Sequence, residues 1–136
     1  MKTVKTNLIL GAALLGGVLA IHSGAQSTVL AAETGQSLFD TNCSTCHGSN
    51  GKGQPGVFPP LAGNHEVTAA DAKPIIHIVL NGLNVPKKIE GQQYNGGMPS
   101  WKALSDSDIA AILTYVRSAW GNKASAVTEK EVKEAR

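Results

Sequence analysis

The residues best suited to chemistry stand together in the first half of the chain. Cys43 and Cys46 are its only cysteines, and His47 follows the second one directly. Two thiols on one helical turn can each add to a vinyl group of haem, and the adjacent imidazole is then carried beneath the iron. The Cys-Ser-Thr-Cys-His pattern therefore predicts one covalently attached haem c, with His47 as an iron ligand.

Three other kinds of site also use two closely spaced cysteines: a thioredoxin-type dithiol, half of a zinc site and a plain disulfide. A thioredoxin motif belongs to alternating strands and helices, and no convincing parallel strand is predicted here. Zinc requires four ligands, yet the remaining histidines, His22, His65 and His77, stand in no paired spacing. The histidine directly after the second cysteine favours haem over these alternatives.

Met98 is the second candidate iron ligand. Because Met1 initiates the chain, Met98 is the only methionine that a processed protein would keep. It lies in the glycine-rich segment 94–101, YNGGMPSW, about fifty residues after the cysteines. A methionine is usually a flexible gap filler in a core, but this loop context favours a ligand. A thioether opposite an imidazole raises the potential of haem iron, suits electron transfer and leaves no axial position open.

The N-terminus predicts export. Lys2 and Lys5 precede an apolar run over 8–21, and small residues follow, as in a secretory signal peptide. The run is shorter than the roughly 20 apolar residues that span a bilayer, so an uncleaved anchor is the second interpretation. Either way we expect the working domain to be periplasmic or otherwise exported. The expected regions are a signal peptide over 1–32, a haem domain over 33–124 and a charged C-terminal tail over 125–136.

The charge of the chain limits its partners. The formal net charge is +2, and removing a leader with two lysines and no acids brings it to about zero. A strongly basic face for nucleic acid or anionic lipid is therefore not supported. Local patches at Lys52, or at Lys87 and Lys88, are possible contacts for a partner, although adjacent lysines are more often solvated surface.

Three helices are predicted, over 34–46, 71–81 and 105–120. The last is the clearest, because Ser105 and Asp108 form a capping pattern before a periodic apolar stripe. Glycine and proline make 48–63 a loop that can lie close against a flat ligand. The tail is expected to form a frayed turn beginning at Thr128, with no function assigned.

Four motifs carry a family resemblance: CSTCH at 43–47, FPPLAG at 58–63, YNGGMP at 94–99, and LSD at 104–106 leading into YVR at 115–117. With them, the chain resembles the class I monohaem cytochromes c over roughly 34–122. It is most similar to the bacterial periplasmic type, including the haem domains of alcohol dehydrogenase and terminal oxidase complexes. The long 81–97 stretch departs from the family pattern.

This resemblance implies an all-α cytochrome c fold, with three to four short helices and long loops wrapped around one covalent haem. It implies that Gly35 and Phe39 meet the last helix, whereas periodicity alone leaves open whether Gly35 merely precedes the first helix. It also implies that the Pro59 carbonyl accepts a hydrogen bond from the outer nitrogen of His47, which orients the ring.

The expected function is one-electron transfer in a respiratory chain, with the haem iron cycling between Fe(II) and Fe(III) and with donor and acceptor redox proteins as partners. No enzymatic activity, small-molecule substrate or nucleic acid is expected. The main alternative is a cytochrome c subunit of a membrane-bound dehydrogenase or oxidase complex, peripherally associated with the membrane. Two further alternatives are a haem enzyme, in which Met98 would be absent from the iron, and a cysteine redox protein without haem.

Overall fold

The structure is a computed structural model that describes residues 34–84 and 86–136. The predicted signal peptide, with Lys2, Lys5 and His22, lies outside the described residues. Within 34–84 and 86–136, no helix is long and apolar enough to cross a membrane.

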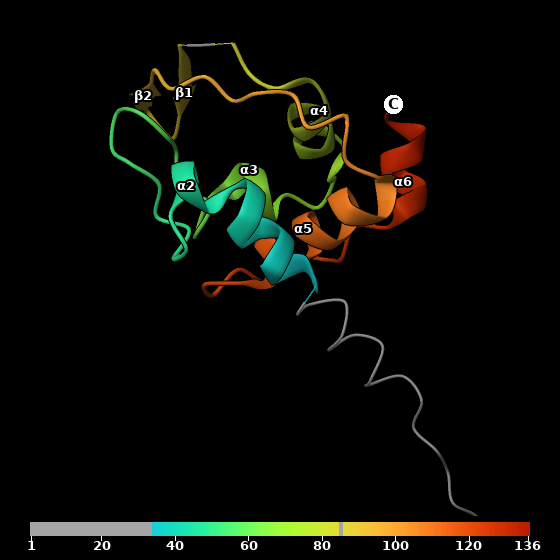
Figure 1. The fold of residues 1–136 in the computed structure, drawn as a ribbon. Helices are drawn as coiled ribbons and strands as arrows, with labels where there is room; N and C mark the ends of the chain where they lie inside the picture. The colour runs from blue at the N-terminus through green and yellow to red at the C-terminus, as the bar shows by residue number, and fades with distance from the viewer. Residues whose placement is uncertain (1–33, 85) are drawn as a thin grey trace, which may run out of the picture.

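Short helices joined by long loops make up most of the described chain (Figure 1). They comprise a helix over 34–42, α2 (Ser44–His47), α3 (His65–Thr68), α4 (Lys73–Asn81), α5 (Asp106–Ser118) and α6 (Glu129–Glu134), with the strands β1 (Lys87–Ile89) and β2 (Gln92–Tyr94). The all-α class is confirmed. The segment expected as one helix over 34–46 forms two pieces, because the helical pattern breaks at Cys43.

The capping pattern predicted for α5 is present. Ser105 is the N-cap, and its side chain accepts a hydrogen bond from the backbone of Asp108 at 3.1 Å. Such a bond satisfies a backbone N–H that has no partner inside the helix. The helix ends at Ser118, two residues before the expected end, and Trp120 takes a left-handed backbone conformation with φ of 53°.

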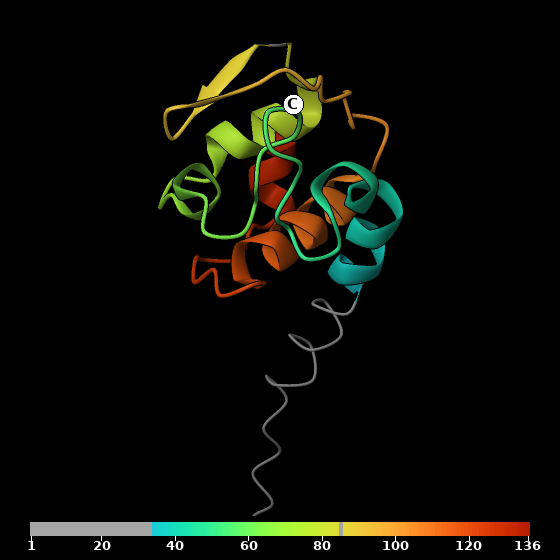
Figure 2. The same cartoon turned by 90° about the vertical axis from the view of Figure 1, so that its left-hand side faces the viewer.

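The helix over 34–42 crosses α5 at very short range (Figures 1 and 2). A Cβ added at Gly35 would lie 2.3 Å from the backbone oxygen of Ala111, so only glycine allows this approach. Gly35 lies inside the helix, which decides between the two interpretations of this residue. One turn later Phe39 is fully buried, and its ring centroid lies 5.6 Å from that of Tyr115.

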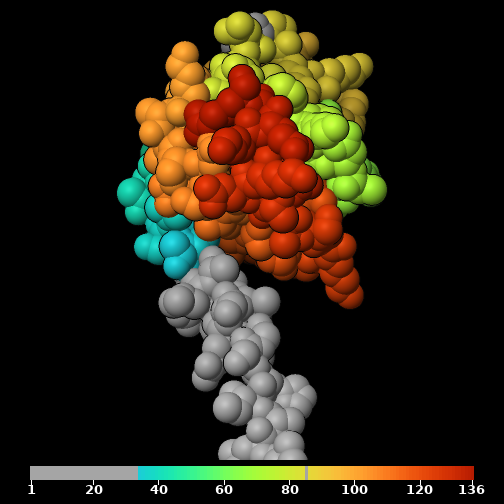
Figure 3. Space-filling view, turned by 90° about the vertical axis from the view of Figure 1, so that its right-hand side faces the viewer, coloured from blue at the N-terminus to red at the C-terminus, as the bar shows by residue number. Residues whose placement is uncertain are grey.

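The C-terminal segment folds onto the core, so the expected frayed turn is wrong. Thr128 and Glu131 form a capping box at the start of α6, and Val132 is fully buried against residues of α4 and α5. Figure 3 shows this segment, in red, lying over one face of the molecule between the orange and green segments. A single buried valine in a charged hexapeptide is too weak a periodic signal to reveal this packing from sequence.

Buried Arg117 fixes the turn between α5 and α6. Its guanidinium is fully buried and donates to the backbone oxygens of Ser125 at 2.8 Å and Val67 at 2.7 Å. These charge-assisted bonds satisfy the buried cation. They also hold the chain after α5 in the direction that brings α6 back onto the core.

A β-hairpin occupies much of the long 81–97 stretch, for which no element was predicted. β1 and β2 are antiparallel, with Lys87 opposite Tyr94. Glu90 and Gly91 form the connection with φ of 48° and 82°, as a two-residue hairpin turn with positive φ at both positions requires. The hairpin lies at the opposite end of the molecule from the helix over 34–42 (Figures 1 and 2).

Candidate haem site

One cavity collects all the predicted site residues. Its lining includes Cys43, Cys46, His47, Pro59 and Met98, and it encloses about 640 Å³ when the open mouth is included. A second hollow of about 670 Å³ shares four of these residues and reaches inward to the buried faces of α4 and α5.

The two cysteines lie on a single helical turn. Cys43 is the N-cap of α2, and its carbonyl accepts bonds from the backbones of Cys46 at 3.2 Å and His47 at 3.0 Å. The thiols form no disulfide with each other. Burial, and then the charge of Cys46, raises the pKa of Cys43 to about 11. Because dithiol nucleophiles act as thiolates, this environment disfavours the dithiol alternative.

The ring of His47 is oriented by a backbone oxygen. Its Nδ1 lies 3.0 Å from the carbonyl of Pro59. Since a carbonyl only accepts, Nδ1 carries the proton, and the lone pair of Nε2 stays available for a metal. Burial lowers the pKa of His47, although the Pro59 bond opposes this shift. The neutral imidazole, which is the form that binds a metal, is thereby favoured.

The glycine-rich loop after the cysteines holds Pro59 in this position. Gly53 donates to the His47 carbonyl at 2.7 Å. A Cβ on Gly53 would lie 2.4 Å from the oxygen of Phe58 and 2.5 Å from that of Pro59, and its φ is 64°. Both the conformation and the close approach require glycine here. The loop therefore folds back on the haem motif instead of extending into solvent.

Met98 is held by the end of α4. Its backbone exchanges two hydrogen bonds with Leu83, at 2.9 Å and 3.2 Å, and the backbone of Trp101 donates to Val79 at 2.9 Å. A Cβ on Gly82 would lie 2.4 Å from the Met98 oxygen. The glycine that ends α4 thus lets the methionine segment lie directly against the helix, so two regions about fifteen residues apart in sequence meet at the cavity.

Comparison with known proteins identifies the family. The family model for cytochrome c matches residues 32–120. The chain belongs to the cytochrome c family. Haem c, bound covalently, is therefore the cofactor of this cytochrome. Residues after 120, including α6, lie beyond the match.

Several relatives of this cytochrome share only part of their length with it. Cytochrome c-552 of Thermus thermophilus is 40% identical over 96 residues, which cover 68% of this chain and 64% of the relative. The cytochrome c subunit of a quinone alcohol dehydrogenase from Gluconacetobacter polyoxogenes is 32% identical, over 76% of this chain and 21% of the subunit. The CcoP subunit of a cbb3-type cytochrome c oxidase from Azospirillum brasilense is 31% identical, over 68% of this chain and 30% of the subunit. The chain therefore spans less than two thirds of the length of each.

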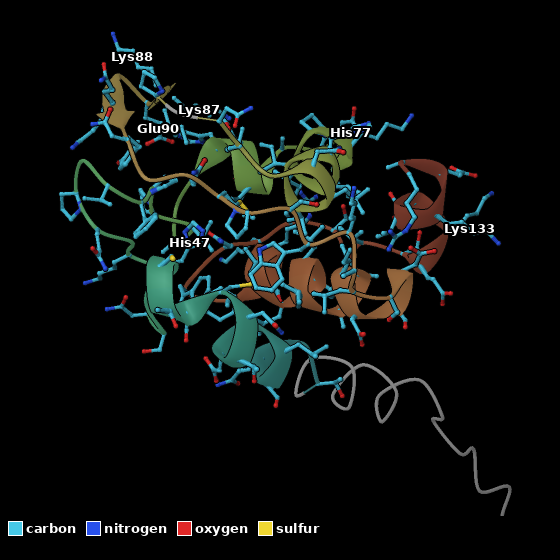
Figure 4. The ribbon with its side chains drawn as sticks, turned by 45° about the horizontal axis from the view of Figure 1, so that its top comes forward. His47, His77, Lys87, Lys88, Glu90 and Lys133 are labelled. Carbon is cyan, nitrogen blue, oxygen red and sulfur yellow. The ribbon has the colours of Figure 1, made fainter. Side chains whose placement is uncertain are left out.

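The residues present fit a haem. The cavity offers two unbridged thiols, an imidazole whose Nε2 is available, and a methionine, in walls formed largely by apolar side chains. Thiols, imidazole and thioether are the donor types that hold and ligate haem in cytochromes. The other described histidines, His65 and His77, do not line the cavity. Figure 4 shows His77 on α4, well separated from His47.

The sequence did not reveal the part that the hairpin plays in this site. Lys87, Ile89 and Tyr94 line the cavity, and Ile89 and Tyr94 are buried. The available signal was weak: a Glu-Gly pair between two three-residue strands with little apolar alternation. The hairpin closes the cavity on the side away from the helix over 34–42.

Proposed function

We propose that this cytochrome is an exported one-electron carrier, with its haem attached through Cys43 and Cys46 and its iron bound by His47 and Met98. When bound, the haem supplies an iron that cycles between Fe(II) and Fe(III). The observation that carries the proposal is that these four side chains line one cavity. His47 is further oriented by a backbone bond, and Met98 belongs to a segment anchored to α4.

Backbone contacts would hold the two proposed iron-binding side chains, His47 and Met98, in place when a haem is bound. The Pro59 carbonyl restrains rotation of the His47 ring, because turning it would break the 3.0 Å hydrogen bond. The paired backbone bonds between Leu83 and Met98 restrain the segment that carries Met98. With both side chains held in this way, a bound haem would supply one-electron chemistry with little movement of the surrounding protein.

Replacing Met98 tests the axial assignment. In the oxidised Met98→Ala protein we expect loss of the near-infrared sulfur-to-iron charge-transfer band. We also expect a fall in potential on the order of 0.1 V, within the roughly 0.8 V range that axial ligands span. Spectroscopy and potentiometry of the purified holoprotein measure both. Pro99→Ala, a neighbouring exposed position, serves as the control and should keep the band.

Two results would contradict this proposal. An unchanged near-infrared spectrum in Met98→Ala would show that Met98 does not bind the iron. Binding of carbon monoxide by the reduced parent protein at neutral pH would show an open axial position and favour a haem enzyme.

A second candidate function is that of a subunit in a membrane-bound dehydrogenase or oxidase complex. It is supported by the similarity to cytochrome subunits of alcohol dehydrogenase and oxidase complexes. Gentle extraction from the native membrane followed by size-exclusion chromatography separates the two cases. A free carrier elutes alone near the 14.1 kDa of the 136-residue chain or below, whereas a subunit co-elutes with larger proteins.

A further inference from the structure

In the described part of the chain, a single cationic side chain other than a histidine lines the haem cavity. Lys87 is the only lysine or arginine among the described residues that border either hollow. It lies on β1, where alternate side chains point to opposite faces. Lys87 and Ile89 therefore share the face turned to the cavity, and exposed Lys88 lies on the other. Figure 4 shows both lysines on the hairpin above His47.

Lys87 is held at the cavity edge by one acidic partner. Its Nζ lies 2.6 Å from Oε2 of Glu66 at the start of α3. Of the residues that the structure describes, Glu66 is the only acidic one in the lining of either hollow. The Lys87 side chain is 27% exposed and that of Glu66 44%. An ammonium group carries three donors, and Glu66 accepts one of them. The remaining donors are available to a second acceptor.

The chemistry of haem provides that acceptor. Haem carries two propionate carboxylates, and the walls that receive it are mostly apolar. A carboxylate taken out of water without a cation or sufficient donors is strongly destabilised. We propose that Lys87 is the counter-ion of a haem propionate and that Glu66 positions its ammonium group. The inference rests on the haem site proposed above and adds a residue that no motif of the chain indicated.

Two consequences follow from this role. A positive charge near the haem disfavours the extra positive charge of Fe(III), so Lys87 raises the reduction potential. The negative charge of Glu66 lowers the reduction potential, while its hydrogen bond orients the Lys87 ammonium group. Because Lys87 is partly buried, its effect on the haem is screened by solvent less than that of an exposed lysine.

The neighbouring lysine provides a matched control. We would measure the potential of the Lys87→Gln and Lys88→Gln holoproteins, each of which loses one positive charge, and of Lys87→Arg. The expected result is a lower potential in Lys87→Gln, a clearly smaller shift in Lys88→Gln and near-parent behaviour in Lys87→Arg. The carbon-13 signals of labelled haem propionates should shift in Lys87→Gln and not in Lys88→Gln. Equal potential shifts in the two glutamine variants, with unchanged propionate signals, would overturn the proposal.

Glu66→Gln separates this role from simple attachment of the hairpin to α3. If Lys87 only joined the two elements, Glu66→Gln and Lys87→Gln would perturb the propionate signals equally, and that result would also refute the proposal. We expect Glu66→Gln to raise the potential while the propionates stay paired with Lys87. The near-infrared methionine band should persist in every variant. Its absence from the parent protein would instead contradict the axial assignment.

Discussion

At the scale of single residues, close backbone contacts explain why certain positions are glycine. Gly35 allows the first described helix to touch the backbone of α5, and Gly53 allows its loop to fold back beneath Pro59. In both places the atoms that an added Cβ would meet belong to backbone carbonyl groups. Backbone cannot rotate away as a flexible side chain can, so these contacts determine how closely the elements approach.

The first prediction concerns Gly35→Ala. Alanine favours a helix by about 1 kcal/mol over glycine, but its Cβ would lie 2.3 Å from the Ala111 oxygen. Overpacking typically costs about 1–3 kcal/mol, so we expect a net loss in the free energy of unfolding. Urea titration of the holoprotein measures it. Ser37→Ala, at an exposed position of the same helix, should be close to neutral, and equal stability of both variants would disprove the predicted clash.

At the scale of elements, α6 depends on its first turn. Its capping box joins Glu131 Oε2 to the Thr128 backbone at 2.7 Å, and Thr128 Oγ1 to the Glu131 backbone at 3.2 Å. The Glu131 carboxylate also accepts a hydrogen bond from the Thr128 hydroxyl at 2.7 Å. The bonds that it accepts from the Thr128 backbone and hydroxyl hold its pKa below its ordinary value. A lowered folded-state pKa means that the charged form stabilises α6 above the unfolded pKa and loses that effect as pH falls through the folded one.

The second prediction follows from the direction of this pKa shift. Glu131→Gln keeps an acceptor in the capping box but cannot ionise. The parent should be the more stable protein at pH 6, and its advantage should shrink as pH falls below about 4, where glutamate protonates. Urea titrations of both holoproteins between pH 6 and 3 measure the difference. A constant or growing advantage at low pH would contradict the assignment.

At the scale of the whole molecule, the core is built around the haem cavity and closed by the C-terminal segment. Val127 and Val132 belong to the same apolar cluster as residues of α4 and α5. The last residue of the sequence also contacts the segment that follows Met98. The Arg136 guanidinium donates to the backbone oxygens of Lys102 at 2.9 Å and Leu104 at 2.7 Å. The C-terminal segment thus stabilises the stretch of chain that joins Met98 to α5.

The third prediction is the effect of deleting residues 126–136, which leaves the Ser125 acceptor of buried Arg117 in the chain. Fully burying a valine contributes about 1.5–3 kcal/mol, so loss of two buried valines should lower the free energy of unfolding by about 3–6 kcal/mol. Urea titration of the holoprotein measures the loss. Val132→Ser should reproduce a large part of it, whereas Lys133→Ser, the next residue and exposed, should not. An unchanged midpoint in the truncated protein would show that the segment does not support the fold.

The sequence by itself determined the cofactor and predicted where it attaches, because Cys43, Cys46 and His47 lie within five residues and their chemistry depends only on local spacing. It also determined the start of α5, since a cap and a long apolar stripe are local signals. Met98 could be selected as a ligand candidate from its loop context alone.

Tertiary structure decided which distant groups meet these residues: the Pro59 carbonyl on His47, the end of α4 on Met98, and the hairpin that brings Lys87 to the cavity. Those contacts depend on the close backbone approaches at Gly35, Gly53 and Gly82 and on burial of α6, which arise only when segments far apart in the chain pack together.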